Sequence, residues 1–272
     1  MTYPRVAGKH AFPAVVSPAE HAEFVRVMFN GGRPPSVSKA VLLYQGSVLR
    51  RLVARLPCQE RKGWVSGELW MTGAEPGLVA VCGRFGKGAP AAGLVVEQLI
   101  GLGARQIISV GTAGGLAPRL ERGDIVVCDR AIRDEGLSYH YLPDAKYCAP
   151  SQELTGRLST ALRADGQRFC TGTSWSTDAP YRETAREVGL YRAENALTVD
   201  MEAAGIFAVG QFRDVHVAAA FGVSDIVRDR SSRRPSADRQ CGMAIDHLVD
   251  AALRALRAAD DLHVSVPGGC AR

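Results

Sequence analysis

Short apolar runs alternate with amphipathic segments from about residue 40 to residue 256. Leu78-Val79-Ala80-Val81-Cys82 is a continuous apolar run, typical of a strand buried inside a parallel sheet. Similar runs predict strands at 40–44, 107–110, 124–127 and 217–223. The segments between them predict helices, with Ser47 as N-cap of the second and Pro90 opening the third, at 18–30, 47–56, 90–103, 151–164, 182–193, 201–213 and 238–259. This alternation predicts an α/β protein, a three-layer α/β/α sandwich.

The domain organisation follows from the absence of repeats and low-complexity linkers. We expect a single domain over 1–272, preceded by a proline-containing N-terminal arm of about residues 1–35 that wraps a surface or a neighbouring chain. No apolar run approaches the roughly 20 residues of a membrane-spanning helix. Residues 1–16 lack the apolar centre of a signal peptide, and we therefore expect a cytoplasmic protein without membrane contact.

Charge and cysteine content narrow the classes of partner. The net charge is +5, and the one dense basic stretch is 228–234. Such a stretch can contact nucleic acid, but a solvated loop near a small anionic substrate fits better, and we expect no nucleic-acid partner. The seven cysteines are odd in number and include no C-x-x-C pair. This argues against a zinc site and a disulfide framework, and we expect no metal.

A glycine loop joins a predicted strand to a predicted helix at Gly86-Lys87-Gly88-Ala89-Pro90-Ala91. Glycines let backbone N–H groups approach a ligand, and a helix N-terminus favours negative charge. Alone, the pattern also suits a dinucleotide site. That site needs an acidic residue about 20 positions later, where this chain has Ser109-Val110-Gly111-Thr112-Ala113-Gly114. The dinucleotide interpretation is therefore disfavoured.

Three further motifs carry polar groups at strand ends. In 110–116 small residues surround the hydroxyl of Thr112, which suits a loop against a sugar or an oxyanion, or simply a tight turn. Glu202 follows Asp200-Met201 at a strand-to-helix junction. It could accept two hydrogen bonds from a ribose diol or only complement the helix dipole. Asp225 ends the apolar run 221–223 and could donate a proton if buried, or cap a turn.

In this order and spacing, the motifs resemble those of the nucleoside phosphorylase-I superfamily, which includes purine nucleoside phosphorylases, uridine phosphorylases and related nucleosidases. The resemblance runs from about Ala40 to Leu256 and covers G-x-G-x-P, V-G-T-A-G-G-L, D-M-E-A-A and V-S-D. It implies a central mixed, partly barrel-like sheet. It also implies cleavage of a ribonucleoside by inorganic phosphate as co-substrate, without a cofactor. A homo-oligomer is implied as well, either a dimer or a hexamer built of dimers.

The resemblance also implies a role for individual residues. Asp225, assisted by Arg239, would protonate the departing base. Phosphate would be bound by Gly46, Arg50, Gly86, Gly88 and Thr112, with Arg61 as a compensating residue. The nucleoside would be bound by Thr112, Ala113, Gly114, Tyr181, Met201 and Glu202, with His10 of a neighbouring subunit near the 5′-hydroxyl.

Two departures from the family pattern affect the expected chemistry. Hexameric phosphorylases carry a phosphate-binding arginine where this chain has Ser109. The family loop P-G-D-P-x-R keeps only Gly46 and Arg50, and Arg61 or Arg84 is left to compensate. The acid at 225 favours a purine base over uridine. The alternatives are a uridine phosphorylase, a nucleosidase that uses water, and a nucleoside-binding protein without catalytic activity.

Overall fold

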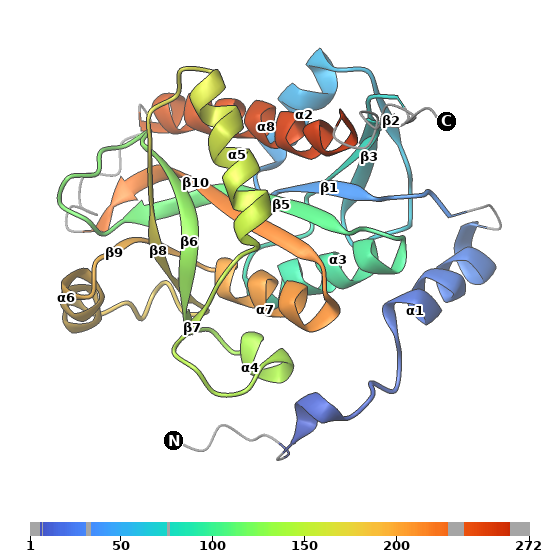
Figure 1. Ribbon diagram of the computed structural model, residues 1–272, viewed down its shortest axis with the longest axis horizontal. Helices are drawn as coiled ribbons and strands as arrows, with labels where there is room; N and C mark the ends of the chain where they lie inside the picture. The colour runs from blue at the N-terminus through green and yellow to red at the C-terminus, as the bar shows by residue number, and fades with distance from the viewer. Residues whose placement is uncertain (1–5, 7, 31–33, 75–76, 228–236, 262–272) are drawn as a thin grey trace, which may run out of the picture.

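The computed structural model describes residues 6, 8–30, 34–74, 77–227 and 237–261 (Figure 1). The basic stretch 228–234, expected to form a loop near the substrate, lies outside these ranges. The strands are β1 Lys39–Leu43, β2 Cys58–Glu60, β3 Glu68–Thr72, β4 Val79–Gly83, β5 Gln106–Gly115, β6 Ile125–Asp134, β7 Tyr147–Cys148, β8 Phe169–Thr177, β9 Ala196–Asp200 and β10 His216–Ile226. The helices are α1 Pro18–Val25, α2 Gly46–Arg55, α3 Ala89–Gly101, α4 Ser138–Tyr141, α5 Gln152–Ala164, α6 Ala185–Ala193, α7 Ala203–Arg213 and α8 Ala237–Asp261.

One mixed sheet combines an open part with a closed barrel. Strands β5, β10, β6, β8 and β9 pair in a ring, because β9 pairs with β8 on one side and with β5 on the other. The sheet continues outward from β5 through β1, β4, β3 and β2. Parallel pairs join β5 to β1 and to β10, whereas β10 and β6 are antiparallel. The expected mixed, partly barrel-like sheet is therefore confirmed.

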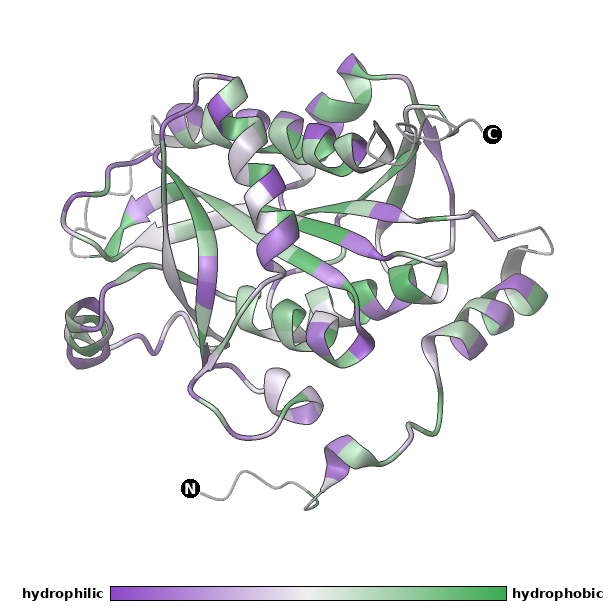
Figure 2. Cartoon of the chain, in the orientation of Figure 1, coloured by the Kyte–Doolittle hydropathy of each residue, from purple (hydrophilic) through white to green (hydrophobic). Residues whose placement is uncertain are grey.

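Helices cover both faces of this sheet, as the three-layer prediction requires. Helices α2, α5 and α8 lie on one side and α3 and α7 on the other (Figure 1). One apolar cluster includes Val95 and Leu99 of α3 and Phe207 of α7, and another includes Leu158 of α5 and Leu248 of α8. The central strands are mainly hydrophobic, while the helices alternate between hydrophobic and hydrophilic residues (Figure 2). Such layering buries the sheet on both sides.

Two local predictions are wrong. Helix α2 already begins at Gly46 and its N-cap is Gln45, so Ser47 lies within the first turn instead of capping it. The small residues of 111–115 do not form a loop, because β5 continues as a strand to Gly115. Their size serves packing: a Cβ on Gly111 would lie 2.9 Å from the Tyr44 ring, and one on Gly115 would lie 2.8 Å from Ile226.

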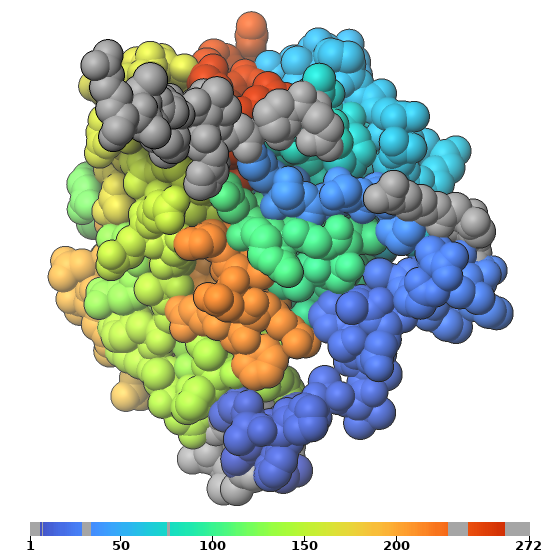
Figure 3. Space-filling model, turned by 45° about the vertical axis from the view of Figure 1, so that its right-hand side comes forward, coloured from blue at the N-terminus to red at the C-terminus, as the bar shows by residue number. Residues whose placement is uncertain are grey.

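The N-terminal arm lies against the helical layer of α3 and α7 (Figure 3). Helix α1 packs on α3, and Lys9 Nζ lies 2.6 Å from Nδ1 of His140 in α4. A groove of about 820 Å³ separates the arm from the body. None of the helices in the described part of the chain is both long and apolar enough to cross a membrane.

Candidate active site

A pocket of about 160 Å³ opens where β5, β9 and β10 come together. Several predicted site residues share it, although they are far apart in the sequence. Its lining consists of Tyr44, Gln45, Lys87, Thr112, Ala113, Gly114, Pro180, Glu183, Val199, Asp200, Met201, Glu202, Ser224 and Asp225. The parallel strands β5 and β10 bring 112–114 and 224–225 to the same edge, where ligands of α/β proteins bind.

Two backbone N–H groups hold the Glu202 side chain in the pocket. Its Oε1 accepts a hydrogen bond of 2.6 Å from the backbone N–H of Gly88, and its Oε2 accepts one of 3.3 Å from Met201 N–H. Gly88 has φ 91°, in the left-handed region that favours glycine, and this conformation brings the glycine loop against the carboxylate. Burial and the neighbouring Asp200 charge raise the pKa of Glu202 to about 7, despite the two N–H donors.

Asp200 holds this junction together. Its Oδ1 accepts hydrogen bonds from the hydroxyls of Ser174 (3.1 Å) and Ser176 (2.6 Å), and its Oδ2 accepts from the backbone N–H groups of Glu202 and Ala203. The carboxylate therefore caps the first turn of α7 and fixes Glu202 above it. Burial raises the pKa of Asp200. Asp200 was not predicted as a site residue, although an aspartate just before a helix is a known capping signal.

A second polar group connects the beginning of α2 to β5. Gln45 Nε2 donates to Thr112 Oγ1 at 3.1 Å, and its Oε1 is buried without a hydrogen-bond partner among the described residues. Beside it, Tyr44 Oη lies 2.9 Å from Ser109 Oγ. Ser109 is 2% exposed, so the position of the family arginine is closed to a ligand. The available sequence signal for Gln45 was its place in the loop, where the family pattern has the first proline.

Asp225 reaches the pocket through a bulge in β10. The register between β10 and β5 shifts between Val223 and Asp225, so Asp225 pairs with Gly114. A bulge re-aims the side chain that follows it. Asp225 is 9% exposed, and its Oδ1 lies 2.8 Å from the Ser224 hydroxyl. It faces the same cavity as Glu202.

The remaining predicted residues divide into two groups. Gly46 and Arg50 lie together at the start of α2, and Gly86 and Gly88, with φ 104° and 91°, form the loop before α3. Neither these four residues nor the others are among the described residues that line this pocket. Arg61 lines a separate hollow with Pro34 and Trp64, Tyr181 is fully exposed, His10 lies in the arm, and Arg239 is exposed near the start of α8.

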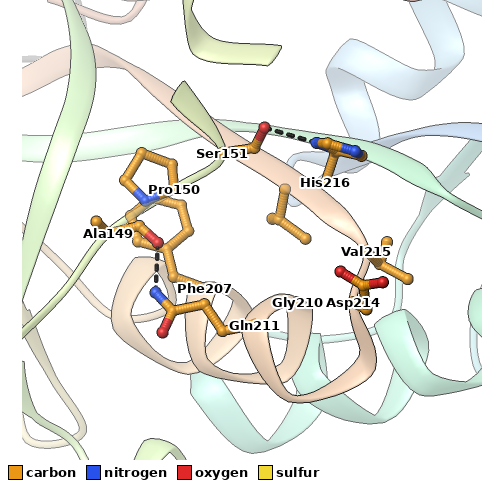
Figure 4. Close-up of a pocket in the computed structure, with 10 residues that line it drawn as sticks. Ala149, Pro150, Ser151, Phe207, Gly210, Gln211, Asp214, Val215 and His216 are labelled. Atoms are coloured by element: carbon orange, nitrogen blue, oxygen red, sulfur yellow. Dashed lines mark hydrogen bonds between the residues drawn. The ribbon is translucent and has the colours of Figure 1, made fainter. Parts of the chain in front are cut away.

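A different pocket, of about 310 Å³, lies between the start of α5 and the end of α7 (Figure 4). Ser151 Oγ and His216 Nδ1 are 2.8 Å apart there, and Gln211 Nε2 donates to the carbonyl of Ala149. Ser151 also accepts from Leu154 N–H, as the N-cap of α5. None of the sequence motifs lies in this pocket. Within the described ranges, no three His, Cys, Asp or Glu side chains are grouped so that they could hold a metal ion.

Comparison with known proteins agrees with the motifs. The model of the Phosphorylase superfamily matches residues 46–258. The chain belongs to this superfamily. A guanosine phosphorylase of Halorubrum lacusprofundi is 31% identical over 134 residues, 49% of this chain and 56% of that protein. A uridine phosphorylase of Treponema pallidum is 32% identical over 145 residues, again 49% and 56%. The chain thus spans little more than half the length of these relatives.

Solved structures support the fold. A uridine phosphorylase from Vibrio fischeri superposes with a TM-score of 0.74 at 21% identity, covering 84% of this chain and 99% of the other. A purine nucleoside phosphorylase from Toxoplasma gondii, in complex with immucillin-H, gives a TM-score of 0.74 at 20% identity, with 84% and 95% covered. Relatives of both base preferences therefore share this architecture.

Proposed function

We propose that this protein is a nucleoside phosphorylase, a pentosyltransferase that cleaves a ribonucleoside with inorganic phosphate to give free base and ribose 1-phosphate. The observation that carries the proposal is that Thr112, Glu202 and Asp225 line one pocket, with Glu202 held by the glycine loop at Gly88. Its partners would be small molecules, a nucleoside and phosphate, and it would need neither a metal nor an organic cofactor. We further propose a cytoplasmic homo-oligomer, a dimer or a hexamer of dimers, that does not act on nucleic acid or membranes.

Glu202 would orient the sugar. As a carboxylate it accepts hydrogen bonds from the 2′- and 3′-hydroxyls, and such bonds to a charged acceptor are the stronger kind. This fixes C1′ against the attacking phosphate. During cleavage, positive charge develops on the sugar and negative charge on the base. The phosphate oxygen forms a bond to C1′ while the electron pair of the C1′–N bond leaves with the base.

Asp225 would act on the base. Its proton passes to N7 of a purine as the glycosidic bond breaks, with Arg239 assisting. A pyrimidine has no N7 to receive it, and this is the reason to expect purines to be preferred over uridine. The named relatives include both guanosine and uridine phosphorylases, so they support the family and leave the preference to experiment.

Hydrolysis is the second candidate, because Ser109 is buried against Tyr44 where the family arginine would bind phosphate. The test incubates inosine, guanosine, adenosine and uridine with and without phosphate, and identifies the sugar product. Phosphate-dependent release with ribose 1-phosphate as product supports the proposal. Equal release of free ribose without phosphate would identify a nucleosidase, and no release from any nucleoside would identify a binding protein. Faster turnover of uridine than of purines would overturn the base preference alone.

A further inference from the structure

Glu183 is a carboxylate of the candidate active site that the proposed reaction does not use. It lines the pocket together with Asp200, Glu202 and Asp225. Asp200 accepts hydrogen bonds from two hydroxyls and two backbone N–H groups, and Glu202 accepts them from two backbone N–H groups. Glu183 belongs instead to the segment between β8 and α6, outside the strands that carry or precede the other three carboxyl groups.

The backbone on both sides of Glu183 is fixed by hydrogen bonds. A turn precedes it, in which Arg182 N–H donates to the carbonyl oxygen of Ala179 at 2.8 Å. The residue that follows it, Thr184, is the N-cap of α6 and forms a capping box with Glu187. A side chain that selects a ligand needs a support of this kind, because a loosely held group cannot discriminate between similar shapes.

The segment that carries Glu183 begins beside the strand that leads to the sugar-binding residue. Strands β8 and β9 are parallel, and Ser176 pairs with Asp200, so the two strands end at the same edge of the sheet. Glu183 comes shortly after β8, and Glu202 comes directly after β9. Glu183 is neither buried nor fully exposed, so its side chain can meet a ligand in the pocket while remaining in contact with water.

The orientation proposed for a purine leaves one edge of the base without a partner. N9 carries the sugar, which Glu202 holds, and N7 receives the proton of Asp225. Both nitrogens belong to the five-membered ring, so the far edge of the six-membered ring, with N1 and C2, faces another part of the lining. Of the four carboxyl groups among the described lining residues, Glu183 is the one left for this edge, because Asp200 is bonded within the fold.

A carboxylate at this edge distinguishes the common bases by their hydrogen-bond donors. An ionised carboxylate only accepts hydrogen bonds. Guanine presents N1–H and its 2-amino group side by side, and these match the two oxygens of one carboxylate in a bidentate pair. Hypoxanthine presents N1–H alone. Adenine has an unprotonated N1 whose lone pair repels a carboxylate, and uracil flanks its single N–H with two carbonyl oxygens. Guanine is therefore the base that such a site selects.

We infer that Glu183 determines the base specificity of the pocket and that the preferred substrate is a 6-oxo-2-aminopurine ribonucleoside, guanosine. The inference rests on the proposed function, in which Asp225 delivers a proton to N7. The electron pair of the broken C1′–N9 bond stays on the base, which this proton leaves neutral and with N1–H in place. The Glu183 carboxylate thus keeps its two donors during cleavage and does not meet a base anion.

The experiment compares guanosine, inosine and adenosine as substrates of wild type and Glu183→Ala at saturating phosphate. Wild-type kcat/KM should be highest for guanosine, intermediate for inosine, and lower for adenosine by roughly 100-fold or more, because a site built around a donor rejects an analogue that lacks it. In Glu183→Ala, kcat/KM for guanosine should fall roughly 10- to 100-fold, the loss expected for hydrogen bonds to a charged group. Adenosine cleavage should not slow.

Glu183→Gln separates base recognition from a structural role. The glutamine amide both donates and accepts, so it matches adenine, whose N1 accepts and whose 6-amino group donates. This variant should shift the ratio of kcat/KM from guanosine toward adenosine by roughly 10-fold or more. Arg182→Gln, at the exposed neighbouring position that does not line the pocket, is the matched control and should keep the wild-type ratios. Equal slowing of all three nucleosides in both Glu183 variants would overturn the inference.

Binding without turnover distinguishes this inference from the proposed function. The 9-deaza analogues of guanosine and adenosine have a carbon–carbon glycosidic bond that cannot be cleaved. In calorimetric titration, wild type should bind the guanosine analogue more tightly, and Glu183→Gln should lose that preference. Equal affinities of wild type for the two analogues would overturn the role of Glu183. Release of free ribose without phosphate would overturn the proposed phosphorolysis and leave the role of Glu183 standing if the binding preference is found.

Discussion

Replacing Glu202 by glutamine should make the protein more stable at alkaline pH while impairing its reaction. The pKa of Glu202, raised from 4.5 to about 7 by burial and by Asp200, makes the folded state bind more protons than the unfolded chain between these values. Wild type therefore loses stability as the pH rises through this window. At about 1.4 kcal/mol per pH unit, the loss reaches about 3 kcal/mol above pH 7.

The glutamine variant avoids this loss because its amide does not ionise. Its carbonyl oxygen can still accept from Gly88 N–H, but the amide nitrogen no longer accepts from Met201 N–H, at a cost of about 1 kcal/mol. At about pH 8.5 the variant should therefore unfold with a free energy about 2 kcal/mol above that of wild type. At about pH 5, where wild-type Glu202 is protonated, that gain should vanish or reverse. The kcat/KM for ribonucleosides should fall at every pH.

Urea denaturation at the two pH values measures the difference, and Glu187→Gln supplies a control of opposite sign. The pKa of Glu187 is lowered from its ordinary 4.5 by its hydrogen bonds to Thr184, so its charged form stabilises the fold at both pH values. That variant should therefore be less stable than wild type by about the same amount at both pH values. An identical stability gap between Glu202→Gln and wild type at both pH values would refute the reasoning. Wild-type kcat/KM in the variant would refute the diol-binding role.

Three further changes test other parts of the structure. Asp225→Asn should slow inosine and guanosine cleavage roughly 100-fold. Cleavage of a 7-methylated purine nucleoside, whose base leaves without protonation, should slow far less. Equal slowing for both kinds of substrate would make the residue structural. Asp200→Ala should lower the free energy of unfolding by about 3 kcal/mol in urea denaturation, because four donors lose their acceptor, and a wild-type midpoint would contradict this. Gly101→Ala should release the N-terminal arm, since its Cβ would lie 2.2 Å from the carbonyl oxygen of Pro18. Limited proteolysis should then cut the arm faster while the melting temperature of the core stays the same. Unchanged cleavage would show that α1 shifts without detaching.

Apolar runs in the sequence predicted the apolar buried strands well, but they could not reveal the strands that are rich in polar residues. The predicted strand Leu78–Cys82 differs from β4 by one residue at each end. The agreement is close because a strand that is covered on both faces must be apolar throughout. Strand β8, which reads Phe-Cys-Thr-Gly-Thr-Ser-Trp-Ser-Thr, carries no such run. Its hydroxyls at Ser174 and Ser176 are directed at the Asp200 carboxylate, a tertiary contact that no local pattern encodes.

The sequence predicted those site residues whose polar side chain stands out at the end of, or within, an apolar run. Glu202, Asp225 and Thr112 each end or interrupt an apolar run, and all three line the pocket. Gln45 escaped notice because its partner Thr112 is 67 residues away and meets it only through the folded sheet. The positions expected for Tyr181, His10 and Arg239 depend on loops and on a neighbouring chain, and they stay predictions.

The closed barrel constrains how such a protein can change over evolution. Thr112, Glu202 and Asp225 lie on or directly after strands whose pairing is complete on both sides, so none can move without breaking main-chain hydrogen bonds. The chemistry proposed for these residues is thereby tied to the scaffold. The outer wall of the pocket, with Gln45, Pro180 and Glu183, lies outside the strands and is free to vary. Substitutions at these outer positions could thus change which ligand the pocket accepts, while the carboxyl groups of Glu202 and Asp225 stay where they are.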